Sequence, residues 1–450
     1  MSLIATDQLR VVIGLGQTGL SCARYLARKS LPFVLVDTRE IPPNLDQIRS
    51  EFPDAPLYCG ELEVDVLLQA SEILLSPGVA KDQPVIQQAV AAGVKLSGDI
   101  DLFCREISAP VIAITGSNAK STVTTLVGQM AADAGIDVGV GGNLGTPVLD
   151  MLLDGEQQLY VLELSSFQLE TVNDLRAEVA TVLNVSPDHL DRYDNKMQLY
   201  YQAKHRIFRG AKQAVINRDD ALTSPLVNSS VSIISFGLGK PDLKDFGVII
   251  DQGQSYLAKG REKLLPVNAL KTRGDHNVAN GLAALALGEA AGLPIESILQ
   301  TLQQFTGLKH RCQWVAEKQE VSFFNDSKGT NVGATVAALN GLGASLTEDA
   351  RIVLIAGGVG KGAEFDDLNG PMAKFGRGLV LIGQDGSQIE SAVSASQAVY
   401  ADDMKDAVEK AAFMAKPGDV VLLSPACASF DMFSGFPERG DVFIAAVEAL

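Results

Sequence analysis

Residues 111–122 place a lysine and several hydroxyl groups where a phosphate could bind. The segment reads VIAITGSNAKST, so an apolar strand leads into a short loop that ends in Lys120 and Ser121. Backbone N–H groups of such a loop face an anion, the lysine reaches the outer phosphates, and the serine hydroxyl can bind Mg²⁺. We therefore predict a nucleotide site whose residues are Gly116, Ser117, Asn118, Ala119, Lys120, Ser121 and Thr122.

This loop departs from the strict GxxxxGK[ST] pattern, because Ile114 and Ala119 stand at its two glycine positions. An alanine with positive φ costs on the order of 1 kcal/mol, which binding of a triphosphate can offset. The following helix is expected to bury one face, formed by Val123, Leu126 and Met130. The alternative is an ordinary helix start with an incidental Lys-Ser pair.

A second glycine-rich turn lies near the N-terminus. Gly14, Gly16 and Gly19 follow the apolar run RVVI in the GxGxxG spacing, and Asp37 ends the next strand candidate, PFVLVD. These glycines allow a tight turn and close approach to a pyrophosphate, while the acid can accept from sugar hydroxyls. The pattern admits a UDP-sugar as readily as NAD, and glycines that only pack a helix on a strand are the alternative.

Two further side chains follow strand candidates. The segment LYVLELSSF puts Glu163 at the C-terminal end of an apolar strand, where open parallel sheets bind their ligands, and a carboxylate there suits Mg²⁺. His189 follows the strand candidate VATVLNV. It is either a site residue or a solvated loop histidine.

Lys204 lies within an apolar helical stripe that includes Met197, Tyr200, Tyr201, Ile207 and Phe208. Such a lysine either extends its charge to the surface or loses its proton through desolvation. A neutral buried amine could take up carbon dioxide and become a carbamate. That group would be an additional Mg²⁺ ligand beside Glu163.

The length, composition and net charge of the chain limit the number of domains and the kinds of partner that it can have. A chain of 450 residues with 46% hydrophobic content is too long for one ordinary core and predicts two to four domains. The net charge of -17 argues against nucleic acid or an anionic membrane as a partner. We see neither a membrane span nor a signal peptide, and five scattered cysteines fit reduced thiols. We expect a cytoplasmic monomer without membrane insertion.

Short apolar runs alternate with helical periodicity from end to end, which indicates α/β domains with largely parallel sheets. We predict three domains, covering residues 1–98, 99–307 and 308–450. The second includes an antiparallel patch in GVIIDQGQSYLAKG. The third contains RIVLIAGG, GLVLIG and DVVLLSPACAS as parallel strands.

Eight motifs occur in the order found in the Mur ligases, and in their sum the chain resembles that family over essentially its whole length. They are GSNAKST, LELSSFQLE, NVSPDHLDRY, GDHNVAN, HR, NDSKGTN, GGVGKG and LLSPACASFDMF. The resemblance implies a Rossmann-like N-terminal domain that binds a UDP-sugar. It implies a central P-loop ATPase-type domain with a parallel sheet and a small antiparallel sheet. It also implies a Rossmann-like C-terminal domain that binds an amino acid.

The N-terminal GLGQTG and DTR narrow the resemblance to the family members that add D-glutamate to UDP-N-acetylmuramoyl-L-alanine, in cytoplasmic peptidoglycan precursor synthesis. ATP would phosphorylate the alanyl carboxylate, and the D-glutamate amine would then displace phosphate. Reaction would require domain closure. The alternatives are another Mur ligase or a folylpolyglutamate synthase-like ligase. An NAD-dependent dehydrogenase leaves Lys120 and Glu163 without a role, and a nucleotide-dependent switch needs no third domain.

The resemblance also implies a role for each matching residue. ATP would be bound by the phosphate loop together with Asn277, Asn280, Arg311 and Asp326. Two Mg²⁺ ions would be held by Ser121, Glu163, His189 and carbamylated Lys204. The UDP-sugar would contact Leu15, Gly16, Thr18, Asp37, Thr38, Arg39 and Asn143. D-glutamate would contact Thr330, Lys361, Ser429 and Phe436, and Lys328 would add catalytic positive charge nearby.

Three positions depart from the family pattern. Ala119 replaces a glycine, which leaves the loop geometry open. Val359 replaces an aspartate in GGVGKG, which bears on how Lys361 is oriented. Gly329 replaces an alanine, and we expect that change to have little effect.

Overall fold

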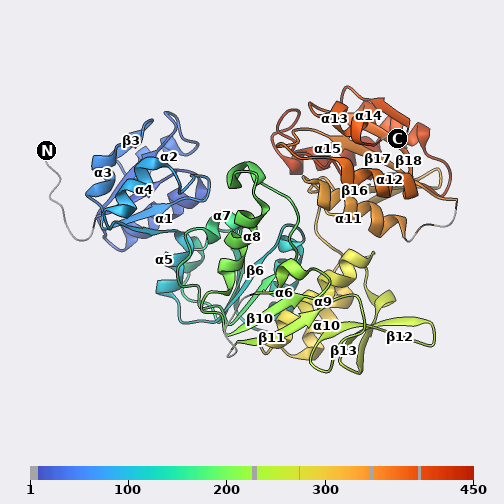
Figure 1. Cartoon of the computed structure of the whole chain (residues 1–450), viewed down its shortest axis with the longest axis horizontal. Coiled ribbons are helices and arrows are strands. Elements are labelled where there is room, and N and C mark those ends of the chain that lie inside the picture. Colours follow the sequence, from blue (N-terminus) through green and yellow to red (C-terminus); the bar gives the residue numbers. More distant parts are fainter. Residues whose placement is uncertain (1–8, 226–230, 273, 345, 347–348, 394–396) are drawn as a thin grey trace. The chain divides into compact units, whose positions relative to one another are not determined.

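A computed structural model describes residues 9–225, 231–272, 274–344, 346, 349–393 and 397–450 (Figure 1). The chain divides into two compact units. One contains the residues up to Val185 together with Gln198–Phe236 and Ala283–Ile298. The other contains Ser186–Met197, Gly237–Leu282 and Leu299–Leu450.

The N-terminal part is a five-stranded parallel sheet in the order β3-β2-β1-β4-β5. Its strands are β1 (Arg10–Ile13), β2 (Phe33–Asp37), β3 (Leu57–Cys59), β4 (Glu72–Leu75) and β5 (Lys95–Ser97). Its helices are α1 (Gln17–Arg28), α2 (Leu45–Glu51), α3 (Val64–Leu68), α4 (Pro84–Ala91) and α5 (Asp99–Glu106). The predicted parallel strands are confirmed, and α1 begins at Gln17, within the glycine-rich turn.

Two of the three fingerprint glycines are required by packing. Gly14 has φ +91°, and a Cβ there would lie 2.8 Å from Val79 Cγ2. A Cβ on Gly19 would lie 2.0 Å from the Gly14 carbonyl oxygen, so only glycine lets α1 approach the turn this closely. Gly16 has nothing within 4 Å of its Cβ position, which leaves open space beside the turn.

The central part contains six parallel strands in the order β11-β10-β9-β6-β8-β7. They are β6 (Val111–Thr115), β7 (Val138–Gly142), β8 (Leu159–Glu163), β9 (Val179–Val182), β10 (Gln213–Asn217) and β11 (Ser232–Phe236). The helices between residues 108 and 305 are α6 (Lys120–Asp133), α7 (Ser166–Leu169), α8 (Met197–His205), α9 (Asp275–Ala290) and α10 (Ile295–Gln304). The predicted face of α6, including Val123 and Met130, is buried as expected.

The predicted antiparallel patch is also present. It is formed by β12 (Phe246–Asp251), β13 (Gln254–Lys259) and β14 (Glu262–Pro266). Gln252 and Gly253 join the first two strands with φ of 48° and 79°, as a tight two-residue hairpin requires. Short 3₁₀ helices are η1 (Asp150–Leu152), η2 (Leu190–Tyr193), η3 (Arg206–Phe208), η4 (Ala221–Thr223), η5 (Val267–Ala269) and η6 (Asp366–Leu368).

The C-terminal part has six strands in the order β15-β16-β20-β17-β18-β19. They are β15 (Gln313–Lys318), β16 (Val321–Asn325), β17 (Ile352–Gly357), β18 (Gly376–Ile382), β19 (Gln397–Tyr400) and β20 (Val420–Leu423). Its helices are α11 (Val332–Gly343), α12 (Asn369–Phe375), α13 (Gly386–Ala392), α14 (Met404–Met414) and α15 (Phe436–Glu448). The three predicted strands are parallel, and only the edge strand β15 runs antiparallel to its neighbour.

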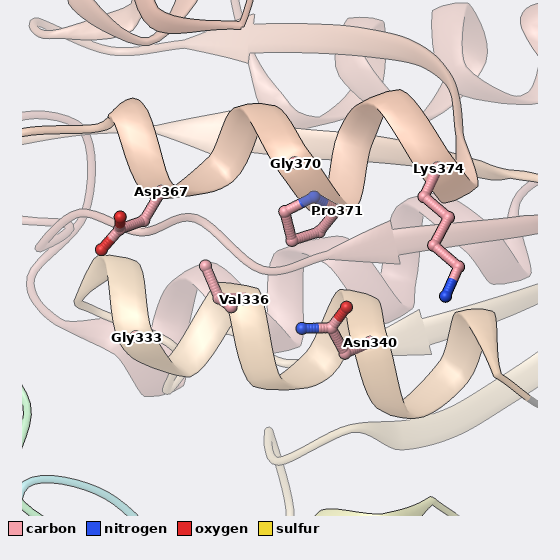
Figure 2. Close-up of a pocket in the computed structure, with 7 residues that line it drawn as sticks. All are labelled: Gly333, Val336, Asn340, Asp367, Gly370, Pro371 and Lys374. Atoms are coloured by element: carbon pink, nitrogen blue, oxygen red, sulfur yellow. The ribbon is translucent and has the colours of Figure 1, made fainter.

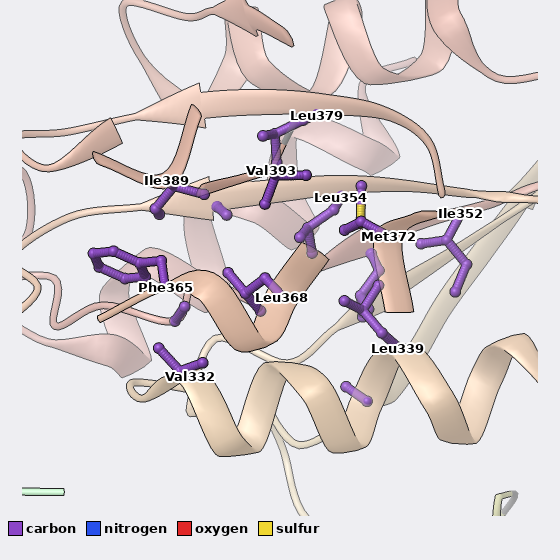
Figure 3. Packing of buried hydrophobic residues seen from close by; sticks show 14 of the residues in the cluster. Val332, Leu339, Ile352, Leu354, Phe365, Leu368, Met372, Leu379, Ile389 and Val393 are labelled. Carbon is purple, nitrogen blue, oxygen red and sulfur yellow. The ribbon is translucent and has the colours of Figure 1, made fainter. Parts of the chain in front are cut away.

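Helices cover both faces of this C-terminal sheet, which explains why its strands read as continuous apolar runs. On one face Leu339 of α11 and Met372 of α12 pack with Leu354 of β17 (Figure 3). On the other, Val408 of α14 and Phe443 of α15 are fully buried against the same sheet. Across the described ranges of the chain, no helix is long and apolar enough to cross a bilayer.

Candidate active site

The phosphate loop occupies the turn between β6 and α6. Ala119 directly precedes the helix with φ 66° and ψ -3°, the left-handed conformation that a glycine would adopt without strain. Its carbonyl oxygen accepts the first helical hydrogen bond, from the Val123 N–H at 3.0 Å. The loop thus keeps its geometry despite the missing glycine.

Asn184, which the sequence did not single out, holds the loop from the end of the neighbouring strand β9. Its backbone oxygen accepts from the Ser117 N–H at 2.9 Å. Its side-chain amide pairs with the Asn118 backbone, accepting from the N–H at 2.8 Å and donating to the carbonyl at 3.1 Å. The only sequence signal was its place in the NVSPD motif.

Two lysine side chains converge on the same loop carbonyl. Lys120 Nζ donates to the Gly116 and Ser117 oxygens, each at 2.9 Å, and Lys204 Nζ donates to the Gly116 oxygen at 2.7 Å. Lys204 is only 1% exposed and lies over the Tyr200 ring at 4.5 Å, so it does not extend to the surface. Lysine side chains from two helices therefore reach the same part of the loop.

The predicted stripe around Lys204 is not one continuous α-helix, because α8 ends at His205 and Ile207 and Phe208 belong to η3. Both apolar side chains are nevertheless buried, as the stripe predicted. Tyr200 is buried as well, and its hydroxyl lies 3.0 Å from Ser117 Oγ. It thereby links α8 to the phosphate loop.

Glu163 ends β8 as predicted and is 2% exposed. Its Oε1 accepts from Asn143 Nδ2 at 2.7 Å, whereas its buried Oε2 has no hydrogen-bond partner. A buried carboxylate oxygen without a partner is costly unless a cation or donor compensates it. Carboxylate oxygen is the ligand that Mg²⁺ prefers, so Glu163 fits a metal-binding role.

His189 lies in the other compact unit from Glu163 and Lys204. It has φ 53° directly before η2, and its Nε2 lies 3.7 Å from Asp188 Oδ2. Within the ranges that the structure describes, no three His, Cys, Asp or Glu side chains are grouped so as to hold a metal. The proposed ligand set of Ser121, Glu163, His189 and modified Lys204 stays a prediction.

A cavity of about 510 Å³ brings together most of the residues predicted to hold the UDP-sugar. The predicted residues that line it are Gly16, Thr18, Asp37, Thr38, Arg39 and Asn143. Residues not predicted for this site also line it, among them Ser76, Gly145, Pro147 and Gln168. Gln168 stands in the LELSSFQLE motif, which was the available signal.

Asp37 lines this cavity and is also engaged within the protein, and its predicted contact with a sugar hydroxyl stays a prediction. Its Oδ2 accepts from the Leu15 N–H at 2.6 Å and from Arg39 Nη2 at 2.7 Å. Its Oδ1 accepts from Arg39 Nε at 2.8 Å. Burial alone would raise the pKa of Asp37, but the bonds from Arg39 and the backbone lower it overall. Leu15 itself is fully buried and contributes through its backbone.

In the C-terminal part, Asp326 follows β16 and is nearly buried. Its Oδ1 accepts from the Cys312 N–H at 3.1 Å, and its Oδ2 accepts from Ser424 Oγ at 2.7 Å. Burial raises the pKa of Asp326 to about 6, although these bonds and the charge of Arg311 oppose the rise. The structure thus brings two predicted nucleotide residues, Arg311 and Asp326, into electrostatic contact.

Three residues predicted for the amino-acid end of the reaction form one cluster. Lys328 Nζ lies over the Phe436 ring at 4.0 Å, and the Thr330 N–H donates to the Lys328 oxygen at 2.8 Å. Ser327 Oγ donates to the Phe436 carbonyl at 2.8 Å, which ties the loop after β16 to the start of α15.

Lys361 and Ser429 lie on two loops joined by a backbone bridge. The N–H groups of Val359 and Ala428 each donate to the carbonyl oxygen of the other at 2.9 Å. Val359 contributes its backbone to this bridge, so its departure from the family pattern does not prevent the pairing. Lys361 has φ 55°, and Ser429 is 2% exposed.

The remaining predicted nucleotide residues, Asn277 and Asn280, lie on α9, where the Asn280 amide donates to Asn277 Oδ1 at 3.4 Å. A separate cavity of about 400 Å³ lies between α11 and α12, lined by residues that include Asn340, Asp367 and Lys374 (Figure 2). None of its lining residues was predicted to have a role.

Family models match three consecutive stretches of the chain. They are described as Mur ligase MurD-like, N-terminal domain, over residues 8–98, Mur ligase middle domain, over 114–288, and Mur ligase, glutamate ligase domain, over 310–427.

Individual proteins resemble the whole chain. A Pseudomonas aeruginosa protein named UDP-N-acetylmuramoylalanine--D-glutamate ligase is 58% identical, over 100% of both chains. In fold, the chain resembles a pseudomurein peptide ligase type C from Methanothermus fervidus, with a TM-score of 0.61, 16% identity and coverage of 98% of this chain and 99% of that one. It also resembles MurF from Acinetobacter baumannii, with a TM-score of 0.60, 17% identity and coverage of 97% and 93%. The chain therefore belongs to the Mur ligase family.

Proposed function

We propose that the protein is an ATP-dependent ligase that joins D-glutamate to UDP-N-acetylmuramoyl-L-alanine. The observation that carries this proposal is the 58% identity, over the full length of both chains, to a protein named for this reaction. The alternatives of a dehydrogenase and a nucleotide-dependent switch have no counterpart in a family of ligases. Another amino acid specificity within the family is the remaining competitor.

ATP is bound by the phosphate loop, where Lys120 and the N-terminus of α6 attract its phosphates. The backbone N–H groups of Ser117 and Asn118 are engaged by Asn184, so the loop is already ordered for its ligand. Arg311 and Asp326 of the C-terminal part also bind the nucleotide, together with Asn277 and Asn280 of α9.

Two Mg²⁺ ions would be held by Glu163, whose buried Oε2 has no hydrogen-bond partner, together with Ser121, His189 and a carbamate on Lys204. When bound, Mg²⁺ offsets negative charge on the phosphate oxygens. The burial of Lys204 supports the carbamate, because desolvation favours a neutral amine. That amine forms a C–N bond to carbon dioxide and releases one proton to solvent.

The reaction has two steps. A carboxylate oxygen of the alanyl group attacks the γ-phosphorus of ATP, which forms an acyl phosphate and releases ADP. The unprotonated D-glutamate amine then attacks the acyl carbon, and the tetrahedral intermediate forms the amide while phosphate leaves with one amine proton. Lys120 stabilises charge in the first step by its position, since phosphoryl transfer needs little covalent help.

D-glutamate is held by cationic and hydroxyl groups of the C-terminal part. Lys361 neutralises one carboxylate, while Ser429 and Thr330 donate to the other. Lys328, whose Nζ lies over the Phe436 ring, supplies further positive charge beside the substrate. An acidic side chain in this pocket would repel the substrate, because D-glutamate carries two carboxylates.

The UDP-sugar occupies the 510 Å³ cavity beside the GxGxxG turn. Arg39, oriented by Asp37, and Thr38 serve its uracil or phosphate end, and Asn143 serves the sugar. The product belongs to peptidoglycan precursor synthesis in the cytoplasm, which supports cell shape and division. The enzyme acts as a monomer.

A phosphate-release assay tests the function. The purified protein is given ATP, Mg²⁺ and UDP-N-acetylmuramoyl-L-alanine, together with a panel of D- and L-amino acids. Among the amino acids of the panel, we expect only D-glutamate to cause phosphate release. Release with a different amino acid would show that the protein has another specificity within the family. Calorimetric titration should detect the UDP-sugar but not NAD, and tight NAD binding without a response to the UDP-sugar would refute the assignment of the first cavity.

A further inference from the structure

A chain of buried hydroxyl groups lies behind Asp326 and has no role in the chemistry above. Ser424 Oγ donates to Asp326 Oδ2 at 2.7 Å and lies 3.1 Å from Thr335 Oγ1. Thr335 Oγ1 in turn donates to the Ser424 carbonyl at 3.2 Å. Ser424 and Thr335 are both fully buried, so water does not compete for these bonds.

Gly329 leaves the space that this arrangement needs. A Cβ at position 329 would lie 2.6 Å from Asp326 Oδ2 and 2.7 Å from Ser424 Oγ. Both distances are shorter than any ordinary contact between non-bonded atoms, so both side chains would have to move. In this chain the glycine therefore leaves the space that the Asp326 carboxylate and the Ser424 hydroxyl occupy.

We infer that Ser424 is a positioning residue of the nucleotide site, because its hydroxyl holds the Asp326 carboxylate in one orientation. Thr335 supports Ser424 through a hydrogen bond, and Gly329 leaves space for both side chains. The inference rests on the proposed nucleotide role of Asp326. The Cys312 N–H binds one carboxylate oxygen and Ser424 the other, so the plane of the group is fixed from two sides. Each oxygen keeps a further lone pair for a ligand donor.

The hydrogen bond from Ser424 also favours the ionised form of Asp326 against the effect of burial, which raises its pKa to about 6. Arg311 and Arg439 are the charged groups that also favour ionisation. Removal of the Ser424 hydroxyl should therefore raise the pKa of Asp326 further. The affinity for a nucleotide should then begin to fall at a higher pH than in the unaltered protein.

The test is calorimetric titration of the full-length protein with ADP and Mg²⁺ between pH 5.5 and 8.5. Ser424→Ala should weaken ADP binding by about tenfold at pH 7.5 and move the pH of half-maximal affinity upward. In turnover, KM for ATP should rise while KM for D-glutamate changes less than about twofold. Ser297→Ala is the matched control, since it removes a buried hydroxyl that donates to the Met130 carbonyl, and it should change none of these quantities.

A double substitution tests the role of Gly329. Gly329→Ala should weaken ADP binding, but less so in the Ser424→Ala background, where one of the two close contacts is gone. Fully additive losses would overturn the inference. If Ser424→Ala does not fold, Thr335→Val replaces it, because it removes the hydroxyl that orders Ser424. Thr335→Val should also weaken ADP binding and raise the pH of half-maximal affinity, but by less.

Asp326→Asn separates this inference from the proposed function. If Asp326→Asn weakens ADP binding and Ser424→Ala leaves both the affinity and its pH dependence unchanged, Ser424 has no positioning role. If Asp326→Asn also leaves the affinity unchanged, both the nucleotide role of Asp326 and the inference are wrong. Release of phosphate with D-glutamate would still support the ligase function in either case.

Discussion

Nζ of Lys204 lies 2.7 Å from the Gly116 carbonyl oxygen, so a buried side chain of α8 reaches the first residue of the phosphate loop. Lys204→Ala should therefore lose most activity, and added short carboxylates should restore part of it by replacing the proposed carbamate. Activity is measured by phosphate release with and without acetate or formate. Lys212→Ala, which removes an exposed lysine paired with Glu178, is the control. A fully active Lys204→Ala variant would leave Lys204 with a packing role only.

Lys120→Ala should lower kcat by about 10²- to 10³-fold while the protein stays folded, because a positioned cation stabilises charge that develops during phosphoryl transfer. In the structure Lys120 bonds to its own loop carbonyls, so its removal should leave the loop anchored by Asn184. Turnover and thermal unfolding are measured on the same preparation. Near wild-type turnover would mean that this loop is not the catalytic nucleotide site.

Ala119→Gly should raise the free energy of unfolding by up to about 1 kcal/mol, since glycine adopts φ 66° without the steric cost that alanine bears. Activity should change only modestly. Urea denaturation measures the stability, and Ala132→Gly in the exposed last turn of α6 is the control, which should not raise it. A large gain in activity would show that the alanine strains the loop during the reaction.

Lys361→Met should raise KM for D-glutamate by at least about tenfold, because a charge-assisted bond to a carboxylate is worth roughly 1.5 to 3 kcal/mol. KM for ATP should change little. Initial rates are measured with each substrate varied in turn. Lys374→Met, which removes an exposed lysine of α12, should leave both constants unchanged. Equal losses for both substrates would indicate impaired domain closure.

Asp99→Asn should stabilise the protein more at pH 7 than at pH 4. Burial raises the pKa of Asp99 to about 6, well above that of an unfolded aspartate, so the folded state binds its proton more tightly. The stability that this proton contributes is complete below about pH 4 and is lost as the pH rises through about 6. The variant has no such pH-dependent loss of stability. The free energy of unfolding of Asp99→Asn relative to the unaltered protein should therefore grow by on the order of 3 kcal/mol from pH 4 to pH 7.

Urea denaturation at several pH values measures that difference, with Asp154→Asn as an exposed control. A constant difference between Asp99→Asn and the unaltered protein from pH 4 to 7 would contradict the prediction.

The strands could be predicted from the sequence because each is a short apolar run bounded by turn residues. Val111–Thr115 and Ile352–Gly357 are buried throughout, as strands covered on both faces must be. The position of Glu163 followed from the same rule, since the carboxyl end of β8 marks the edge where ligands bind. The left-handed geometry of Ala119 could also be anticipated from the glycine that it replaces.

Other features depend on contacts that no local pattern encodes. The pairing of Asn184 with the phosphate loop joins residues 66 positions apart, and the engagement of Asp37 depends on how the chain turns after β2. The end of α8 at His205 breaks a stripe that reads as continuous in sequence. His189 belongs to one compact unit and Glu163 and Lys204 to the other, so no local pattern links these residues.

The pair of Asp37 and Arg39 also determines how the first cavity responds to its surroundings. Hydrogen bonding lowers the pKa of Asp37 overall and raises that of Arg39, so both partners stay ionised from about pH 5 to 9. Asp99 and Asp326, by contrast, change charge near pH 6. This pair therefore gives the wall of the first cavity the same charges throughout that range of pH.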